Sequence, residues 1–384
     1  MQKILFVLPS FSTGGTLSSF LSIYDYFKCK YDIYVLGLSG KVSNDLNISS
    51  KSLSTPLLIN LFLSKSSELN TFEKVFAFPV KVLKKIGGFL NISLDNLIYR
   101  LYANKIGGIY DIVIGFEEGP ATKFASFCSN ARKIAWVHCD YSRTSNFNKE
   151  LQIYMQFEKI VCVSNYTKNV FIDTYPSLEG RIIYIYNILN YHQIVFKSKE
   201  PISNQLYRND VFTIISVGRF SKVKRFMEIP NIAKILKLRG LSFIWYVLGP
   251  ISKENREDFN HLVNTNELED CVVHLGNQVN PYPYFRNSDL LVCLSSSEAC
   301  PMIFNEAKIL RLPIVTTDFP SSSEFVKSGF DGDVSALDSI AETIIRHITD
   351  SEYHRQIIRN IQNYNDINDN IVAQIEALFD GGMS

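Results

Sequence analysis

Short apolar runs alternate with segments of helical periodicity along most of the chain. The runs are residues 4–8, 33–38, 111–116, 133–138, 159–163 and 182–186 in the first half, and 211–217, 242–248, 271–275, 289–294 and 313–317 in the second. Strands that alternate with helices are typical of βαβ units, in which helices cover a parallel sheet. The pattern therefore predicts an α/β fold with parallel sheets.

The two sets of runs are separated by residues 191–210, which are polar and show little periodicity. A chain of 384 residues also exceeds the usual size of one hydrophobic core. We therefore expect an N-terminal domain of residues 1–190, a linker of residues 191–210, and a C-terminal domain of residues 211–364.

The composition is that of a folded protein without a strong overall electrostatic field. Hydrophobic residues make up 46% of the chain, charged residues make up 20%, and the formal net charge is +1. This balance excludes a disordered chain and provides no positive field that would recruit nucleic acid. The seven cysteines form no Cys-x-x-Cys pair and lie mostly in apolar runs, which indicates reduced core thiols and a cytoplasmic location.

No apolar stretch reaches the roughly 18–20 residues that a membrane-spanning helix needs. The run Ile4–Leu8 is too short for the core of a signal peptide and is followed by Pro9, so we expect a first strand there. The sequence thus predicts a soluble protein, or one that contacts a membrane peripherally.

An insert, residues 40–108, interrupts the alternation of strands and helices. Residues 73–105 contain six basic side chains against Glu73 and Asp95, namely Lys74, Lys81, Lys84, Lys85, Arg100 and Lys105. One interpretation is an amphipathic helix with a solvated basic face. The other is peripheral contact of residues 74–105 with an anionic membrane, in which each basic residue contributes about 1 kcal/mol.

The stretch from Glu298 to Glu306 contains several residues that could bind a ligand. The run 291–294 predicts a strand and Ser295–Ser297 a turn, while Pro301 suits the first position of a helix, where its missing N–H would be unpaired anyway. Open α/β sheets bind ligands where a strand leads into a helix, and the free N–H groups of that helix attract phosphate. Two carboxylates beside an anion site suit a ligand with hydroxyls and phosphates, such as a sugar nucleotide.

A second group of residues follows the first strand of the C-terminal half. Gly218 permits close backbone approach, Arg219 comes next, and Lys224 lies near the start of a predicted helix, residues 224–238. A guanidinium and an ammonium at this point would suit the two phosphates of a diphosphate. Either cation alone would usually be an ordinary surface charge, but the pair at this spacing favours function.

Together these motifs resemble the retaining glycosyltransferases of the GT-B fold, the glycosyl transferases group 1, of the kind used in bacterial surface polysaccharide synthesis. The matching segments are the two glutamates with their spacing, Val217–Phe220 with Lys224, Leu248–Pro250, His274–Gly276, Asn280–Tyr284 before Asp289, Gly14-Gly15 and Trp136–His138. The resemblance implies two Rossmann-like domains whose parallel sheets face a central cleft. It also implies that the last helix, within residues 365–384, packs back on the first domain through Ile371, Ile375, Leu378 and Phe379.

The resemblance also implies roles for individual residues. Arg219 and Lys224 would hold the leaving diphosphate, Glu298 would contact the donor sugar, and Glu306 would accept hydrogen bonds from the ribose. His138, at the end of an apolar strand, would bond the donor sugar or the leaving group. The rest of the expected donor pocket is formed by Gly14, Gly15, Gly218, Gly276, Cys300, Met302 and Ile303.

The first residues after the run 111–116, Glu117-Glu118-Gly119, have two interpretations. They contact the acceptor, or they are simply acids at the start of a helix, where the dipole favours them. Asp331-Gly-Asp333 is interpreted as a turn and not as a metal site, because the basic pair supplies the charge that a metal would supply.

By this resemblance we expect a metal-independent, retaining glycosyltransferase. It would move a hexose or N-acetylhexosamine from a nucleotide sugar, with a UDP-sugar favoured, to a glycan acceptor in polysaccharide or capsule biosynthesis. The acceptor is expected to be lipid-linked. The nucleotide sugar is a co-substrate, and no other cofactor is expected. The alternatives are a sugar-nucleotide epimerase of the same fold and a non-catalytic partner that binds sugar nucleotides, which Ala299 and Ser321–Ser323 favour because the family has glycines there.

Overall fold

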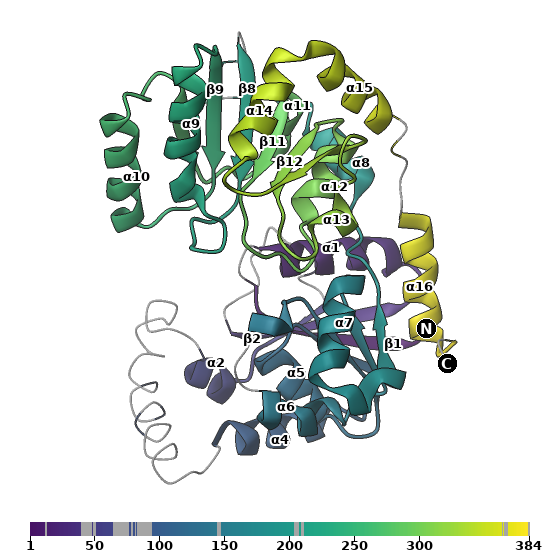
Figure 1. The fold of residues 1–384 in the computed structure, drawn as a ribbon. Coiled ribbons are helices and arrows are strands. Elements are labelled where there is room, and N and C mark those ends of the chain that lie inside the picture. The colour runs from purple at the N-terminus through teal and green to yellow at the C-terminus, as the bar shows by residue number, and fades with distance from the viewer. Residues whose placement is uncertain are drawn as a thin grey trace. The chain divides into compact units, whose positions relative to one another are not determined.

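The computed structural model divides the chain into two compact units (Figure 1). Unit 1 comprises Met1–Ile188 and Asn370–Ser384, and unit 2 comprises Leu189–Asp369. The structure describes all residues except 12–13, 40–47, 49–50, 64–76, 78–79, 81, 83–93, 144–146, 203–206, 209–210, 363, 365–367 and 383–384. Each unit is a parallel sheet with helices, so the predicted fold class of two Rossmann-like domains is confirmed.

The sheet of unit 1 has the strand order β3-β2-β1-β4-β5-β6-β7. Its strands are β1 (Lys3–Ser10), β2 (Asp32–Ser39), β3 (Ser52–Leu53), β4 (Ile112–Phe116), β5 (Arg132–Val137), β6 (Lys159–Cys162) and β7 (Ile182–Tyr184). The described helices are α1 (Gly15–Phe27), α2 (Leu57–Leu63), α4 (Leu94–Ile106), α5 (Pro120–Ser126), α6 (Phe147–Tyr154) and α7 (Asn165–Thr174), with 3-10 turns η2 (Tyr141–Arg143) and η3 (Pro176–Arg181).

The sheet of unit 2 has the order β10-β9-β8-β11-β12-β13. Its strands are β8 (Phe212–Val217), β9 (Phe243–Leu248), β10 (Val272–Gly276), β11 (Leu290–Cys293), β12 (Ile314–Thr317) and β13 (Gly332–Ser335). Its helices are α8 (Tyr191–Lys197), the 3-10 turn η4 (Phe226–Glu228), α9 (Ile229–Leu238), α10 (Lys253–Thr265), α11 (Tyr282–Arg286), α12 (Met302–Ile309), α13 (Ser322–Phe325), α14 (Ile340–Thr349) and α15 (Ser351–Gln362).

Both strand orders contain the point at which ligands bind in open α/β sheets. The order reverses between β1 and β4 in unit 1 and between β8 and β11 in unit 2. At such a switch point, the connections leave in opposite directions and open a crevice at the carboxyl ends of the strands. The loops that follow β1, β4, β8 and β11 are therefore where each unit can build a site.

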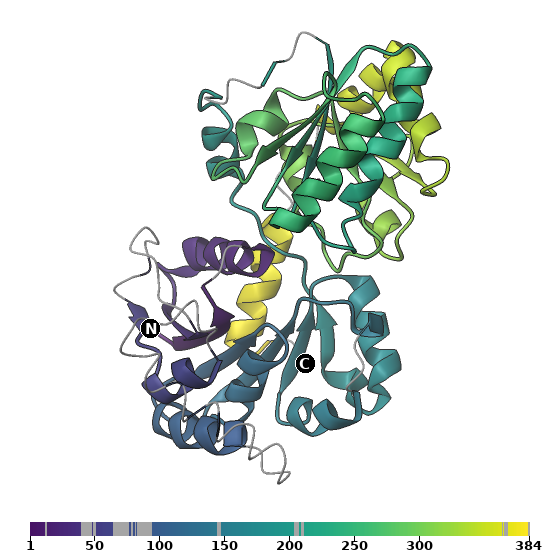
Figure 2. The same ribbon diagram turned by 90° about the vertical axis from the view of Figure 1, so that its left-hand side faces the viewer.

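The last helix, α16 (Asn368–Asp380), packs its apolar stripe within unit 1, beside the first strand (Figure 2). The four residues of the predicted stripe are at most 3% exposed: Ile371, Ile375, Leu378 and Phe379. The Phe379 ring lies 6.3 Å from that of Phe6, and the Arg132 guanidinium donates to the carbonyls of Leu378 and Phe379 at 3.2 and 2.7 Å. These contacts connect residues at opposite ends of the chain.

Several details differ from the sequence predictions. The helix predicted at 224–238 begins only at Ile229, after a 3-10 turn, because Arg225 has a left-handed backbone (φ 51°) that a helix cannot continue through. Pro301 is the N-cap residue of α12, with an extended backbone, and not its first helical residue. The segment 191–210, predicted as a linker, begins with helix α8 and is part of unit 2.

Candidate functional site

Backbone hydrogen bonds donated by Gly218 and Gly249 hold the carboxyl ends of β8, β9 and β10 together. Gly218 N–H donates to Leu248 O and Gly249 N–H donates to Gly276 O, both at 2.9 Å. Gly249 has φ 145°, and a Cβ there would lie 1.7 Å from Gly218 O, so no other residue fits without moving the loop. The close approach fixes the backbone from which Arg219 extends.

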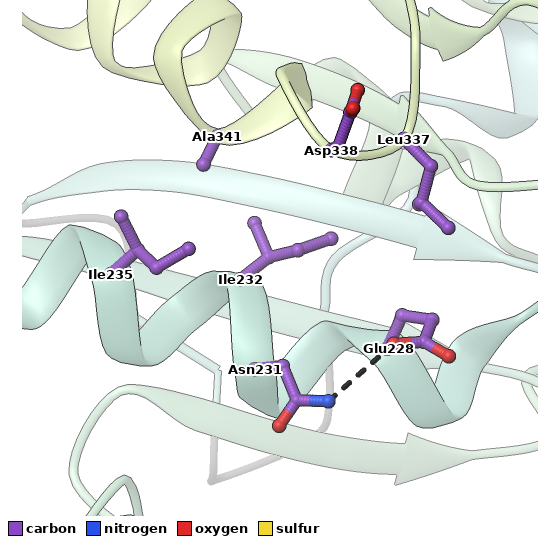
Figure 3. A pocket seen from close by; sticks show the side chains of 7 residues that line it. All are labelled: Glu228, Asn231, Ile232, Ile235, Leu337, Asp338 and Ala341. Carbon is purple, nitrogen blue, oxygen red and sulfur yellow. Dashed lines mark hydrogen bonds between the residues drawn. The ribbon is translucent and has the colours of Figure 1, made fainter.

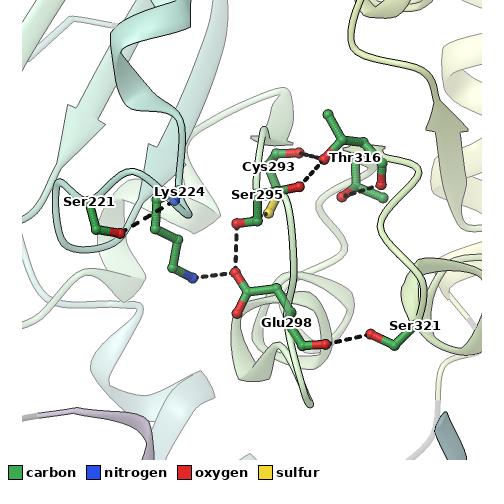
Figure 4. A network of polar contacts seen from close by, with 8 residues as sticks. Ser221, Lys224, Cys293, Ser295, Glu298, Thr316 and Ser321 are labelled. Carbon is green, nitrogen blue, oxygen red and sulfur yellow. Dashed lines mark hydrogen bonds and ion pairs between the residues drawn. The ribbon is translucent and has the colours of Figure 1, made fainter. Parts of the chain in front are cut away.

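Lys224 and Glu298 form the centre of a polar network at the ends of β8 and β11 (Figure 4). Lys224 Nζ lies 2.5 Å from Glu298 Oε1, and Ser295 Oγ donates to the same oxygen at 2.6 Å. Ser321 Oγ donates to the Glu298 carbonyl at 2.6 Å. Burial opposes the charge on Lys224, but the Glu298 carboxylate outweighs burial and raises the pKa of Lys224 above its ordinary value. The site thus contains a firmly protonated ammonium.

Arg219 adds a second cation beside this network. Its side chain is exposed, and its positive charge acts to lower the pKa of Lys224. Among the residues that the structure describes, Arg219 forms no ion pair. Within the described part of the chain, Glu298 therefore pairs with Lys224 alone, and the unpaired charge of Arg219 leaves net positive charge at this edge for an anionic ligand.

The loop between β11 and α12 is connected to both neighbouring loops. Ser296 N–H donates to Val223 O at 2.8 Å, and Thr317 Oγ1 donates to Ser295 O at 2.5 Å. The first turn of α12 has no acidic residue, and its N-cap provides no side-chain bond. The predicted site residues Met302 and Ile303 lie in this turn, where backbone N–H groups suit phosphate or hydroxyl oxygens.

Glu306 lies one turn further along α12, half-buried. Its Oε1 accepts a hydrogen bond from Tyr282 Oη at 3.2 Å. Burial raises the pKa of Glu306 to about 7, and the Tyr282 hydroxyl acts in the opposite direction. From the sequence, Tyr282 is only part of the matching segment Asn280–Tyr284, and no role is predicted for it. Ser295 and Ser321 were also missed as partners of Glu298, because hydroxyls in turns carry no distinctive pattern.

The corresponding edge of unit 1 contains the predicted glycines and His138. Gly14 is the N-cap of α1, without a side-chain bond, and the first turn that begins at Gly15 has no acid. His138 follows β5, and its ring lies edge-on to Phe116 at 4.7 Å. Its Nε2 is buried without a hydrogen-bond partner among the described residues, and burial lowers the pKa of His138 to about 3. The imidazole is therefore neutral at physiological pH.

The adjacent glutamates follow β4 at the same edge. Glu118 Oε2 accepts from the backbone N–H of His138 at 2.9 Å. Burial and the charge of Glu118 raise the pKa of Glu117 to about 7, while a hydrogen bond with Thr16 opposes this shift. Glu117 is therefore a carboxyl group that exchanges a proton near neutrality.

Asp331 and Asp333 each have protein partners. Lys308 Nζ lies 2.8 Å from Asp331 Oδ2, and His347 Nε2 and Tyr353 Oη lie 3.0 and 2.6 Å from Asp333 Oδ2. In the part of the chain that the structure describes, no group of three or more His, Cys, Asp or Glu side chains is arranged to hold a metal ion.

A separate groove of about 420 Å³ lies between α9 and residues 337–341 (Figure 3). Its lining residues are Glu228, Asn231, Ile232, Ile235, Leu337, Asp338 and Ala341, and Asn231 Nδ2 donates to Glu228 Oε2 at 3.4 Å. A groove with two carboxylates and no basic side chain does not suit a diphosphate. The positive edge at Arg219 and Lys224 is the better candidate for an anion.

Two further predictions concern the cysteines and the basic insert. All seven cysteines are free thiols; four of them are buried, and Cys29, which is exposed, differs from the predicted core position. The lysines of the basic insert, Lys74, Lys81, Lys84 and Lys85, lie outside the described residues. Within the described residues, we find no helix with the length and apolar character required to span a membrane.

Comparison with known proteins relates part of the chain to a family. Residues 198–364 match the model of glycosyl transferases group 1. The uncharacterized glycosyltransferase MJ1059 of Methanocaldococcus jannaschii is 24% identical over 255 residues, which cover 63% of this chain and 61% of that protein. The capsular polysaccharide biosynthesis glycosyltransferase CapM of Staphylococcus aureus is 26% identical over 155 residues, 40% of each chain. Both matches span less than two thirds of the relative's length.

Among solved structures, Anabaena Alr3699/HepE in complex with UDP and glucose superposes with a TM-score of 0.74. The match covers 99% of this chain and 100% of that one at 15% sequence identity, so the likeness concerns the fold. The chain therefore has the GT-B fold, and its residues 198–364 belong to the glycosyl transferases group 1.

Proposed function

We propose that this chain is a retaining, metal-independent glycosyltransferase. It transfers a hexose or N-acetylhexosamine from a nucleotide sugar, with a UDP-sugar favoured, to a lipid-linked glycan in polysaccharide or capsule biosynthesis. The observation that carries the proposal is the pair of cations, Arg219 and Lys224, beside Glu298 at the switch point of unit 2. The capsular function named for CapM and the UDP bound to HepE support the choice of pathway and donor.

In this proposal the donor diphosphate binds to the positive edge of unit 2. Arg219 offers a planar fork of donors and Lys224 a compact charge, and both stabilise the negative charge that develops on the leaving group. Glu298 accepts hydroxyls of the donor sugar, and Glu306 those of the ribose. Backbone groups of Gly218, Gly276, Cys300, Met302 and Ile303 complete the pocket.

The proposed step is a displacement on one face of the sugar ring. The bond between the anomeric carbon and the diphosphate oxygen breaks, and the acceptor oxygen bonds to the same face. The departing phosphate oxygen takes the proton of the acceptor hydroxyl. The His138 ring is neutral and its Nε2 has no partner among the described residues, so it is suited to hydrogen-bond the donor sugar or leaving group. Gly14 and Gly15 would allow close approach to the diphosphate.

The experiment that tests this proposal screens UDP-, GDP- and ADP-sugars for thermal stabilisation, since a bound ligand raises stability by mass action. The stabilising donor is then incubated with acceptor glycans, and the product is analysed by NMR. We expect transfer with the anomeric configuration of the donor preserved. Conversion of the donor without acceptor would indicate the epimerase instead. Tight binding without turnover would indicate the non-catalytic partner.

We also propose peripheral contact with the inner face of the cell membrane, where a lipid-linked acceptor is found. The described part of the insert supports this, because Leu97 and Leu101 on α4 are each 57% exposed and flank the exposed Arg100. Exposed leucines next to cations suit the boundary of an anionic lipid layer.

Cosedimentation with vesicles tests the membrane contact. We expect binding to anionic but not neutral vesicles at low salt, weakened by Lys→Glu substitution at Lys81, Lys84 and Lys85. Transfer to a short water-soluble acceptor should be unaffected in that variant. Equal vesicle binding by the variant would show that these lysines form only a solvated face.

A further inference from the structure

Glu306 is held on one side only. Tyr282, the first residue of α11, donates its hydroxyl to Glu306 Oε1 at 3.2 Å across 24 positions of sequence. Among the described residues, no side chain or backbone group donates to Oε2. A carboxylate has about four acceptor positions, so Tyr282 leaves most of them for a ligand.

The backbone that carries Tyr282 is anchored by the turn that precedes it. Asn280 Oδ1 accepts from Tyr282 N–H at 3.2 Å. Asn280 Nδ2 donates to Lys197 O at 2.9 Å and to Glu200 Oε2 at 2.8 Å, which anchors the turn to the end of α8. With the backbone anchored in this way, only side-chain freedom is lost when the Tyr282 hydroxyl holds another group in place.

The contact between Tyr282 and Glu306 also affects the ionisation of Glu306. Burial alone favours the neutral form of Glu306, and the Tyr282 hydroxyl lowers the pKa of this carboxyl toward its ordinary range. Burial raises the pKa of Tyr282 far above its ordinary value, so this hydroxyl remains protonated and donates at any physiological pH. Tyr282 thus favours the ionised carboxylate, which accepts hydrogen bonds most strongly.

We propose that Tyr282 is a positioning residue, which fixes one oxygen of Glu306 so that the carboxylate reads the ribose hydroxyls of the nucleotide donor. The inference rests on the proposed function, because it assigns the ribose to Glu306. It adds a residue that never touches the nucleotide but controls how strongly the ribose is recognised.

Binding of UDP, measured by titration calorimetry between pH 5.5 and 8.5, tests the proposal without any acceptor. Wild-type affinity should rise with pH through about 7, where Glu306 ionises. Tyr282→Phe should bind UDP about 5–10-fold more weakly at pH 7, the range of one hydrogen bond, with the rise displaced to higher pH. The matched control is Tyr284→Phe in the same helix, whose hydroxyl donates to Gln278 Oε1 at 3.0 Å and which should bind as the wild type does.

Deoxy analogues separate positioning from a general loosening of the pocket. If Tyr282 acts through Glu306, Tyr282→Phe should lose part of the preference for UDP over 2′-deoxy- or 3′-deoxy-UDP. In a Glu306→Gln background, Tyr282→Phe should have no further effect on affinity. Thermal unfolding checks that the variants are folded. Removal of one hydroxyl should leave the unfolding midpoint nearly unchanged.

The proposal is overturned if Tyr282→Phe binds UDP with wild-type affinity and pH dependence, while Glu306→Gln binds weakly. It is also overturned if Tyr282→Phe weakens UDP and its deoxy analogues by the same factor. If the wild-type protein binds no UDP, GDP or ADP at all, the proposed function fails together with this inference. The first two outcomes leave the proposed function intact.

Discussion

The two units have similar parallel sheets, but the polar side chains at the carboxyl ends of their strands differ in how fully they are hydrogen-bonded. At the carboxyl edge of unit 2, polar groups satisfy one another: Lys224 and Ser295 share one Glu298 oxygen, and Tyr282 holds Glu306. At the edge of unit 1, His138 Nε2 and the nearby Trp136 Nε1 are buried without partners among the described residues. An unpaired buried polar atom costs about 1–3 kcal/mol, so an additional hydrogen-bond partner at either atom would stabilise the structure.

The edges also differ in charge. In unit 2 Arg219 and Lys224 provide cations, and the pKa of Lys224 is raised by its carboxylate partner. In unit 1 His138 is neutral, since burial lowers its pKa to about 3. If the proposed function holds, we expect unit 2 to stabilise the charge of the leaving group and unit 1 to orient neutral hydroxyls. The following variants test this division.

The largest effect is expected for the cations. Replacement of Arg219 or Lys224 by Ala should lower kcat/KM by about 2–4 kcal/mol in transition-state stabilisation, the range of one lost donor to a developing charge. Steady-state transfer kinetics measure this. The matched control is Arg239→Ala, which removes an equally positive but exposed side chain that pairs with Glu342 on the surface. Normal turnover by Arg219→Ala would remove the assignment.

A smaller effect is expected at His138. Replacement by Ala should lower kcat/KM by about 1–3 kcal/mol, because one hydrogen bond to the donor or leaving group is lost. Since the folded-state pKa of His138 is about 3, the residue is neutral from pH 5 to 9. The pH profile of the variant should therefore keep the wild-type shape. Disappearance of a limb near pH 6.5 would show that His138 titrates and acts as an acid or base.

Glu306 should affect binding more than rate. As a ribose partner it contacts ground state and transition state alike, so Glu306→Gln should raise donor KM about tenfold with kcat nearly unchanged. Because its pKa is about 7, donor binding should strengthen as pH rises through this value, and the variant should lose that dependence. A large fall in kcat at constant KM would place Glu306 at the reacting centre.

No effect is expected from chelation. Activity should be the same with and without EDTA, because side chains and helix ends supply the positive charge. Asp331 and Asp333 are engaged with Lys308, His347 and Tyr353. Loss of transfer in EDTA that magnesium or manganese restores would make these aspartates candidates again.

The fold was largely predictable from hydrophobic patterning. Each of the eleven apolar runs corresponds to a strand, because strands of a sheet covered on both faces are nearly continuous in apolar residues. The strands that patterning missed, β3 and β13, have the sequences Ser-Leu and Gly-Asp-Val-Ser and lie at sheet edges, where burial demands less. The late start of α9 depends on one left-handed residue, Arg225, which propensity does not reveal.

The site was predictable as a location but not as a network. Parallel strands end at the same edge, so Arg219, Lys224 and Glu298 could be expected near one another. The shared oxygen of Glu298 depends on loop geometry across 74 positions, which no local pattern encodes. The Tyr282 contact has the same origin. The burial of His138 Nε2, which has no partner in the described part of the chain, depends on packing around the ring.

The assignment of the diphosphate to unit 2 is tested most directly by calorimetric titration of UDP into three proteins: wild type, Arg219→Ala and Arg239→Ala. We predict saturable binding by the wild type and by Arg239→Ala, and affinity at least about tenfold weaker in Arg219→Ala, since a hydrogen bond to a charged group contributes about 1.5–3 kcal/mol. Equal UDP affinity in all three proteins would contradict the assignment.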